Sequence, residues 1–197
     1  MKNLICLTLL VLVVSLVHGQ ESKKYLKYKN NVKYRTGYVL HKDSVKVKGL
    51  VKESLFNEAK KHSSVTFVHK DGRKVIFFPN QILGYGYSIY KFESTNSRFL
   101  KVVSSGRKVS LYENLSYSTY STPGVGGGPA TSFTTKDENF LVRRAGDTNF
   151  KLVRKRKFSQ EFSKYFERCE ELKKLILNKE LTHKDIKTIV RRYNRCD

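Results

Sequence analysis

Short β-rich runs separated by turn residues dominate the middle of this 197-residue chain. Residues 65–68 (Val-Thr-Phe-Val) and 75–78 (Val-Ile-Phe-Phe) flank Asp71-Gly72, and Asp-Gly supplies the positive φ angles that a tight hairpin turn requires. Pro79 has no N–H for a ladder hydrogen bond, so we expect it to end the second strand. The segment predicts a β-hairpin and carries the clearest local signal in the chain.

The same succession of runs and turns predicts three more hairpins. Their strands are expected at 37–41 with 45–51, at 99–103 with 108–112, and at 140–142 with 150–153. A further run at 82–89 contains Gly84 and Gly86, which permit a bulge or a close approach of another backbone. Consecutive hairpins are typical of an antiparallel meander, which closes into a small barrel or folds into two layers.

From Phe158 onward, apolar residues recur at helical spacing instead of alternating. Thr182 and Asp185 have the spacing of a capping box, which marks a helix start. The apolar stripe then continues to Tyr193, so we expect two or three short amphipathic helices that bury one face each. The predicted fold class is therefore α+β, an antiparallel β-meander followed by C-terminal helices.

These patterns divide the chain into four parts. Residues 20–35 are a basic and aromatic segment that we expect to be mobile or to form an edge strand. Residues 36–154 are expected to form the antiparallel β domain, and residues 155–197 the helical tail. A glycine-rich loop at 122–130 lacks the Lys-Ser/Thr ending of a phosphate-binding loop; whether it is a binding loop or a flexible spacer stays open.

The remaining part, residues 1–19, has the features of a secretory signal peptide. Lys2 supplies a positive charge, residues 4–17 are largely apolar, and Gly19 is a small residue at the expected cleavage site. The apolar run is shorter than the roughly 18–20 residues of a membrane-spanning helix. We therefore expect cleavage near Gly19 and a secreted, periplasmic or envelope-associated protein with no transmembrane segment in the mature chain.

Removal of the signal peptide leaves two cysteines, Cys169 and Cys196. An even number of cysteines in an oxidising compartment favours a disulfide, here one that ties the end of the chain to the first tail helix. The alternative is a reactive thiol near His183.

Basic residues greatly outnumber acidic ones, with 39 Lys and Arg against 17 Asp and Glu, a net charge of +22. Such a balance favours acidic partners, among them an anionic envelope polymer, a lipid headgroup or a protein. The alternative is that surface lysines merely keep the protein dispersed. No sequence pattern for specific nucleic-acid recognition accompanies the charge. The candidate anion-binding residues are Arg154, Lys155, Arg156, Lys157, Arg191 and Arg192.

Motifs for catalysis, cofactors or metals do not stand out in the sequence. No histidine of the mature chain has HxxxH or HExxH spacing, so no catalytic, cofactor-binding or metal-ligating residue is predicted. A non-enzymatic envelope-binding or structural module is the favoured interpretation. One alternative is an envelope hydrolase in which His69 or His183 meets a carboxylate or hydroxyl group. Another is an accessory subunit that docks through the tyrosine-rich stretch 112–120.

Several segments of the chain carry a resemblance to known sequences. They are 37–40 (GYVL), 43–49 (DSVKVKG), 78–85 (FPNQILGY), 99–103 (FLKVV), 109–113 (VSLYE), Cys169-Glu170-Glu171-Leu172 and Tyr193-Asn194-Arg195-Cys196. In these segments the chain resembles a family of exported proteins of unknown function in Gram-negative bacteria. It departs from the family at Glu170, where a proline is usual, and in the added loop 124–128. The resemblance implies a periplasmic or envelope location, supports pairing of the cysteines, and implies no activity.

Overall fold

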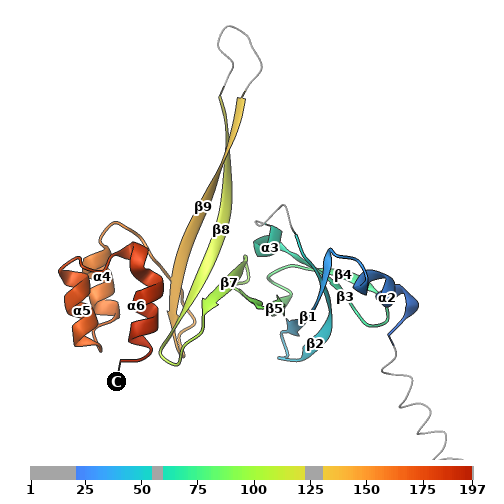
Figure 1. Ribbon diagram of the computed structural model, residues 1–197, viewed down its shortest axis with the longest axis horizontal. Coiled ribbons are helices and arrows are strands. Elements are labelled where there is room, and N and C mark those ends of the chain that lie inside the picture. Colours follow the sequence, from blue (N-terminus) through green and yellow to red (C-terminus); the bar gives the residue numbers. More distant parts are fainter. Residues whose placement is uncertain (1–20, 55–59, 123–130, 197) are drawn as a thin grey trace, which may run out of the picture. The chain divides into compact units, whose positions relative to one another are not determined.

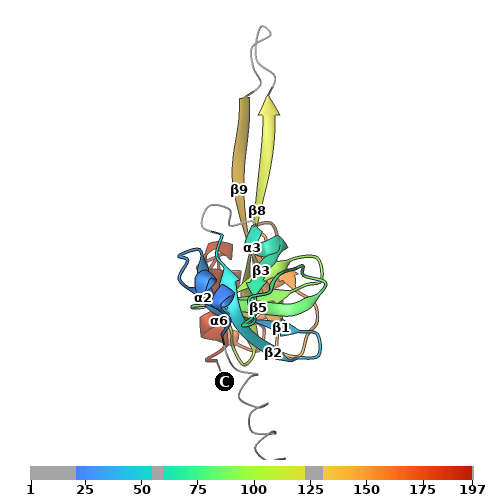
Figure 2. The same ribbon diagram turned by 90° about the vertical axis from the view of Figure 1, so that its right-hand side faces the viewer.

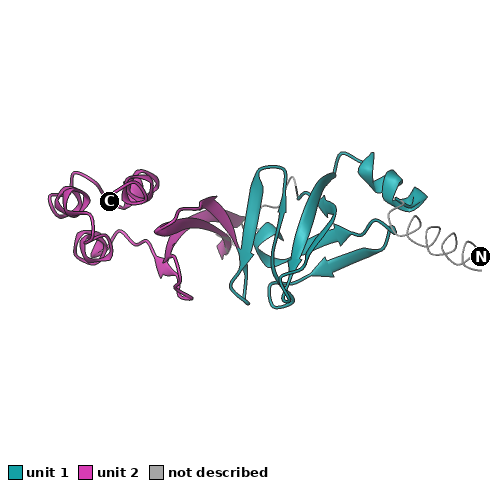
Figure 3. Ribbon diagram, turned by 90° about the horizontal axis from the view of Figure 1, so that it is seen from below, with its two compact units in different colours: residues 1–99 teal, residues 100–197 magenta. Residues whose placement is uncertain are grey.

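The computed structural model describes residues 21–54, 60–122 and 131–196 (Figures 1 and 2). It has the predicted α+β fold, mostly antiparallel strands with short helices concentrated near the C-terminus. Residues 1–19, predicted to be a signal peptide, and residues 123–130 of the glycine-rich loop lie outside the described residues. The chain divides into two compact units, residues 1–99 and 100–197 (Figure 3), and this division falls within the expected β domain.

Unit 1 is built around six antiparallel strands in the order β6-β5-β1-β2-β3-β4. Its predicted hairpins β1–β2 and β3–β4 are confirmed, and Gly72 in the turn of the second has a φ of 85°. The elements are α2 (Lys23–Lys29), β1 (Tyr34–His41), β2 (Lys46–Lys52), α3 (Lys60–Ser63), β3 (Val65–Val68), β4 (Lys74–Phe77), β5 (Ile82–Tyr87) and β6 (Tyr90–Ser94).

Within the basic and aromatic segment 20–35, Lys23–Lys29 form a helix, so the expectation of a mobile segment or an edge strand was wrong for that part. The Ser22 hydroxyl oxygen accepts a hydrogen bond from the Tyr25 N–H at 3.1 Å and so caps α2. Tyr25 is buried with Tyr34, Leu50 and Val68 in an apolar cluster. The helix is held by this packing, which the local Lys-Tyr pattern does not reveal.

Strand β5 contains the predicted irregularity. Leu40 pairs with Gly84, but the next residue of β1, His41, pairs with Ile82, so Leu83 is an extra residue on β5. A Cβ atom at Gly84 would overlap the main-chain carbonyl of Phe92 on β6. Glycine is therefore required there for the close approach that the sequence predicted.

Unit 2 contains four antiparallel strands in the order β10-β9-β8-β7, followed by helices. The predicted hairpins β7–β8 and β9–β10 are both present, although β10 is short. The elements are β7 (Phe99–Ser104, whose first residue belongs to unit 1), β8 (Val109–Thr122), β9 (Thr131–Arg144), β10 (Lys151–Leu152), α4 (Phe158–Tyr165), α5 (Glu170–Leu177), the 3-10 helix η2 (His183–Asp185) and α6 (Ile186–Tyr193).

Strands β8 and β9 pair without a break over fourteen residues each, from Val109–Arg144 to Thr122–Thr131. Their far halves extend beyond β7 and β10 as a two-stranded ribbon (Figures 1 and 2). The sheet is not closed in the described part of the chain. Of the two expected arrangements, a small barrel and a two-layer sheet, the barrel is therefore not observed there.

The three C-terminal α-helices pack against one another and against the part of β8 and β9 that contains Leu111 and Val142. Their buried core combines helix residues such as Phe162, Phe166 and Ile189 with the strand residues Leu111 and Val142. At the start of η2, the Asp185 carboxylate accepts hydrogen bonds from the Thr182 N–H and hydroxyl, each at 2.9 Å. Among the described residues, no helix has the length and apolar character needed to cross a membrane.

Candidate anion-binding site

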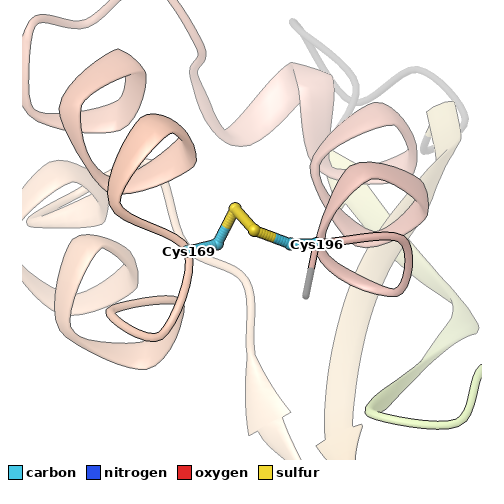
Figure 4. The surroundings of a disulfide bond; sticks show 2 residues. All are labelled: Cys169 and Cys196. Atoms are coloured by element: carbon cyan, nitrogen blue, oxygen red, sulfur yellow. A yellow bond between two sulfur atoms is a disulfide. The ribbon is translucent and has the colours of Figure 1, made fainter.

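The end of α6 is tied to the neighbouring helices by a covalent bond. Cys169, which lies between α4 and α5, forms a disulfide with Cys196, which follows α6 (Figure 4). The pairing predicted from the cysteine count is therefore present. It places Arg168 and the last residues of α6 on the same side of unit 2.

Asn194 ties the same end of α6 to the sheet. Its side-chain oxygen accepts hydrogen bonds from the N–H groups of Lys108 and Val109, both at 3.0 Å. Its side-chain nitrogen donates to the carbonyls of Val109 at 2.8 Å and Val190 at 2.9 Å. A Cβ atom at Gly106 would overlap this amide. The connection between β7 and β8 is thus held against the end of α6.

A cavity of about 550 Å³ opens where these segments meet. Its positively charged residues come from three places that are distant in sequence: the β7–β8 connection, the last residue of β9, and the α4–α5 connection. We call it the arginine cavity, and its lining residues are Arg107, Lys108, Arg144, Ala145, Asp147, Arg168 and Tyr193.

The turns that carry these residues are joined by main-chain contacts. Val109 pairs with Arg144 across β8 and β9, and the Ala145 N–H donates to the Lys108 carbonyl at 2.9 Å. Lys108 and Arg144 are therefore neighbours at one end of the sheet. Tyr193 closes the cavity from the α6 side and is only 3% exposed, with the Lys108 Nζ 5.9 Å from the centre of its ring.

Arg144 is held firmly at the wall of the cavity. Its Nη2 donates to the Tyr165 carbonyl at 2.6 Å, and its guanidinium carbon lies 4.5 Å from the centre of the Tyr165 ring. Its Nε is buried without a hydrogen-bond partner in the described part of the chain. Burial raises the pKa of Tyr165 to about 12, and the nearby Arg144 charge opposes that rise.

The arginine cavity has an excess of positive charge among the described residues. Over the described ranges, Arg107, Lys108, Arg144 and Arg168 form no ion pair, whereas Lys101 lies 3.1 Å from the Glu113 carboxylate elsewhere in unit 2. Asp147 supplies one carboxylate to the lining. Four cations gathered in a concave site create a positive potential that attracts anions.

The residues predicted to bind anions are divided between different places. Lys155 and Lys157 line a second cavity, of about 530 Å³. Arg192 lines a third, of about 280 Å³, beside the disulfide. The remaining three, Arg154, Arg156 and Arg191, are exposed. We call the second the lysine cavity; its lining is Lys155, Lys157, Phe158, Ser159, Gln160, Lys179, Thr182, His183 and Lys184.

The arginine cavity was missed because its three arginines are far apart in the sequence. Two of the turns that form it, at Gly106-Arg107 and Gly146-Asp147, are predictable from the hairpin pattern. In an antiparallel meander both turns lie at the same end of the sheet, and this signal could have brought Arg107 close to Arg144. The addition of Arg168 and Tyr193 depends on how the helices pack.

The histidines of the hydrolase hypothesis have aromatic neighbours. His69 contacts Phe67 with ring centres 5.0 Å apart, and His183 contacts Phe158 at 6.3 Å. Burial lowers the pKa of His69. In the described part of the chain neither ring forms a hydrogen bond with a carboxylate or hydroxyl group, so the geometry gives a catalytic role no support. Within the same residues, no group of three or more His, Cys, Asp or Glu side chains is arranged to hold a metal ion.

The fold and the cavity define a disulfide-bonded α+β protein with a cationic cavity. No protein-family model, curated protein or solved structure matches the chain. The resemblance to exported proteins of Gram-negative bacteria stays a prediction.

Proposed function

We propose that this protein is an exported, non-enzymatic module that binds an anionic component of the cell envelope through the arginine cavity. The observation that carries the proposal is the set of four cations around one cavity, none of them in an ion pair among the described residues. The net charge of +22 also supports binding of an anionic partner, because it attracts anionic surfaces over long distances.

Export after cleavage near Gly19 is part of this proposal. The Cys169–Cys196 disulfide supports it, because such bonds form and persist in oxidising compartments and are rare in the cytosol.

The geometry of the cavity suits anionic oxygen atoms. Three of its four cations are arginines, whose planar forks bind phosphate or carboxylate oxygens with two parallel hydrogen bonds. A bound anion would also relieve the mutual repulsion of the four positive charges. Binding should therefore be strong at low ionic strength and weaken steeply as salt is added.

The test is binding of the mature chain to lipopolysaccharide, a phosphorylated glycolipid, across a series of salt concentrations. Because Arg107 and Arg168 are exposed, the Arg107→Gln/Arg168→Gln variant should fold. We expect it to bind at least about tenfold more weakly than the wild type, because two charge-assisted contacts are lost. Its salt dependence should also be shallower.

The matched control is Lys164→Gln/Lys174→Gln, which removes two exposed positive charges from α4 and α5, away from the cavity lining. Its affinity should stay within about threefold of the wild type, because only the long-range attraction changes. An equal loss in both variants would show that net charge alone drives binding. Binding that does not respond to salt would likewise refute the proposal.

A further inference from the structure

The arginine cavity contains one carboxylate, that of Asp147, among its four cations. Asp147 lies in the turn that follows β9, where its N–H donates to the Arg144 carbonyl at 3.2 Å. In the described part of the chain its carboxylate forms no ion pair with the cations around it. It is exposed and thus available to a ligand.

A carboxylate in a cationic cavity selects among anions. An ionised carboxylate only accepts hydrogen bonds, so it repels an anion that carries no proton. A phosphate monoester loses its second proton near pH 6, and part of it therefore still has an O–H group near neutral pH. A sulfate group is fully deprotonated there and has no hydrogen to donate.

From these groups we propose that the arginine cavity binds a phosphate monoester and that Asp147 discriminates it from sulfate. This inference rests on the proposed function and names the chemical class of its ligand. The arginines bind the anionic oxygens of the phosphoryl group, and Asp147 accepts the hydrogen bond from its remaining O–H.

The size of the cavity fits a ligand larger than a free phosphate ion. Its volume of about 550 Å³ falls within the range of roughly 300–1,000 Å³ for small-molecule sites. The phosphoryl group occupies the cationic end, and the space that is left accommodates the organic part of the ester.

The first experiment is calorimetric titration of the mature chain with inorganic phosphate and, separately, with sulfate. We expect phosphate to bind about tenfold more tightly than sulfate, the effect of one hydrogen bond to a charged group. In Asp147→Asn the amide can donate to sulfate, so the preference should fall to within about threefold. The control Asp137→Asn, an exposed residue on β9 outside the cavity, should keep the wild-type preference.

Two results would overturn the inference: equal binding of phosphate and sulfate by the wild type, or an unchanged preference in Asp147→Asn. If lipopolysaccharide binding still depends on Arg107 and Arg168 in that case, the proposed function stands and only its ligand class is wrong. If that dependence is missing as well, both fail.

The phosphate monoester has two sources, a glycolipid headgroup or a free phosphate ester. Binding to lipopolysaccharide before and after phosphatase treatment distinguishes these two sources. Loss of binding after treatment assigns the cavity to the lipid-linked monoester. Unchanged lipopolysaccharide binding, with inorganic phosphate still titrating the cavity, assigns it to a free ester.

Discussion

Asn194 shows how one side chain can position a site that it does not line. Its amide satisfies the N–H groups of Lys108 and Val109 and two carbonyls. In Asn194→Ala these groups lose their partners, and a buried group left unpaired costs about 1–3 kcal/mol. Because Asn194 is only half-buried, water replaces part of the loss, and we expect the free energy of unfolding to fall by about 2–3 kcal/mol in urea titrations.

The control for this prediction is Asn178→Ala. The Asn178 amide donates to the exposed Glu180 carboxylate at 3.3 Å, and such surface contacts contribute less than about 0.5 kcal/mol. Equal stability of the two variants would contradict the clamping role. Gly106→Ala offers a second check, because its Cβ would displace the Asn194 amide.

The buried phenol of Tyr165 should make the free energy of unfolding depend on pH in the alkaline range. Burial raises its pKa from the ordinary 10.0 to about 12, so between these values the folded chain retains a proton that the unfolded chain has lost. Unfolding then releases a proton, and the free energy of unfolding falls as pH rises from 10 to 12. Tyr165→Phe should lose less stability than the wild type over that interval. Identical pH profiles in urea unfolding would show that this phenol titrates normally.

The disulfide is the structural element that connects the stability of unit 2 to its site. It closes a loop of 27 residues between Cys169 and Cys196, for which loop entropy gives about 3–4 kcal/mol. The Cys169→Ser/Cys196→Ser variant should lose about that much free energy of unfolding. It should also bind lipopolysaccharide more weakly, because Arg168 and Tyr193 lie close to the two cysteines in the chain.

A reducing agent provides the matched test of the disulfide. It should lower the stability of the wild type toward that of the double serine variant and leave the variant itself unchanged. If reduction lowers stability without weakening lipopolysaccharide binding, the bond supports the fold but does not position the arginine cavity.

The elements with strong local signals were predictable from the sequence. Asp71-Gly72 in its turn and the capping pair Thr182 and Asp185 depend on neighbours within a few residues, so the hairpins and the start of the last helices were predicted. Helix α2 was not, because Tyr25 is stabilised by contacts with Leu50 and Val68, far along the chain. The same contacts explain why β2 and β3 bury residues on both faces, although alternation predicts one solvent-exposed face.

The residues of the candidate site were likewise only partly predictable from local sequence. A run such as Arg154–Lys157 is visible in the sequence as a basic tract; all four residues are exposed, and only Lys155 and Lys157 line a cavity. Arg107 and Arg168 lie in two different connections and Arg144 ends β9, and the three come together only through strand pairing and helix packing. Charge density along the sequence therefore led to the hypothesis of an anionic partner, but it did not indicate the residues that form the arginine cavity.

At the scale of the whole molecule, export and oxidation should leave a joint signature in the mass of the native protein. Cleavage near Gly19 removes Lys2 and changes the net charge from +22 to 22 − 1 = +21. Intact-mass analysis of protein from its own host should give residues 20–197 less two hydrogens, because one disulfide is formed. A mass that includes residues 1–19 would refute cleavage. Alkylation of both cysteines without prior reduction would show that the protein resides where thiols stay reduced. An envelope ligand would then be out of reach, even though the arginine cavity would keep its affinity for anions.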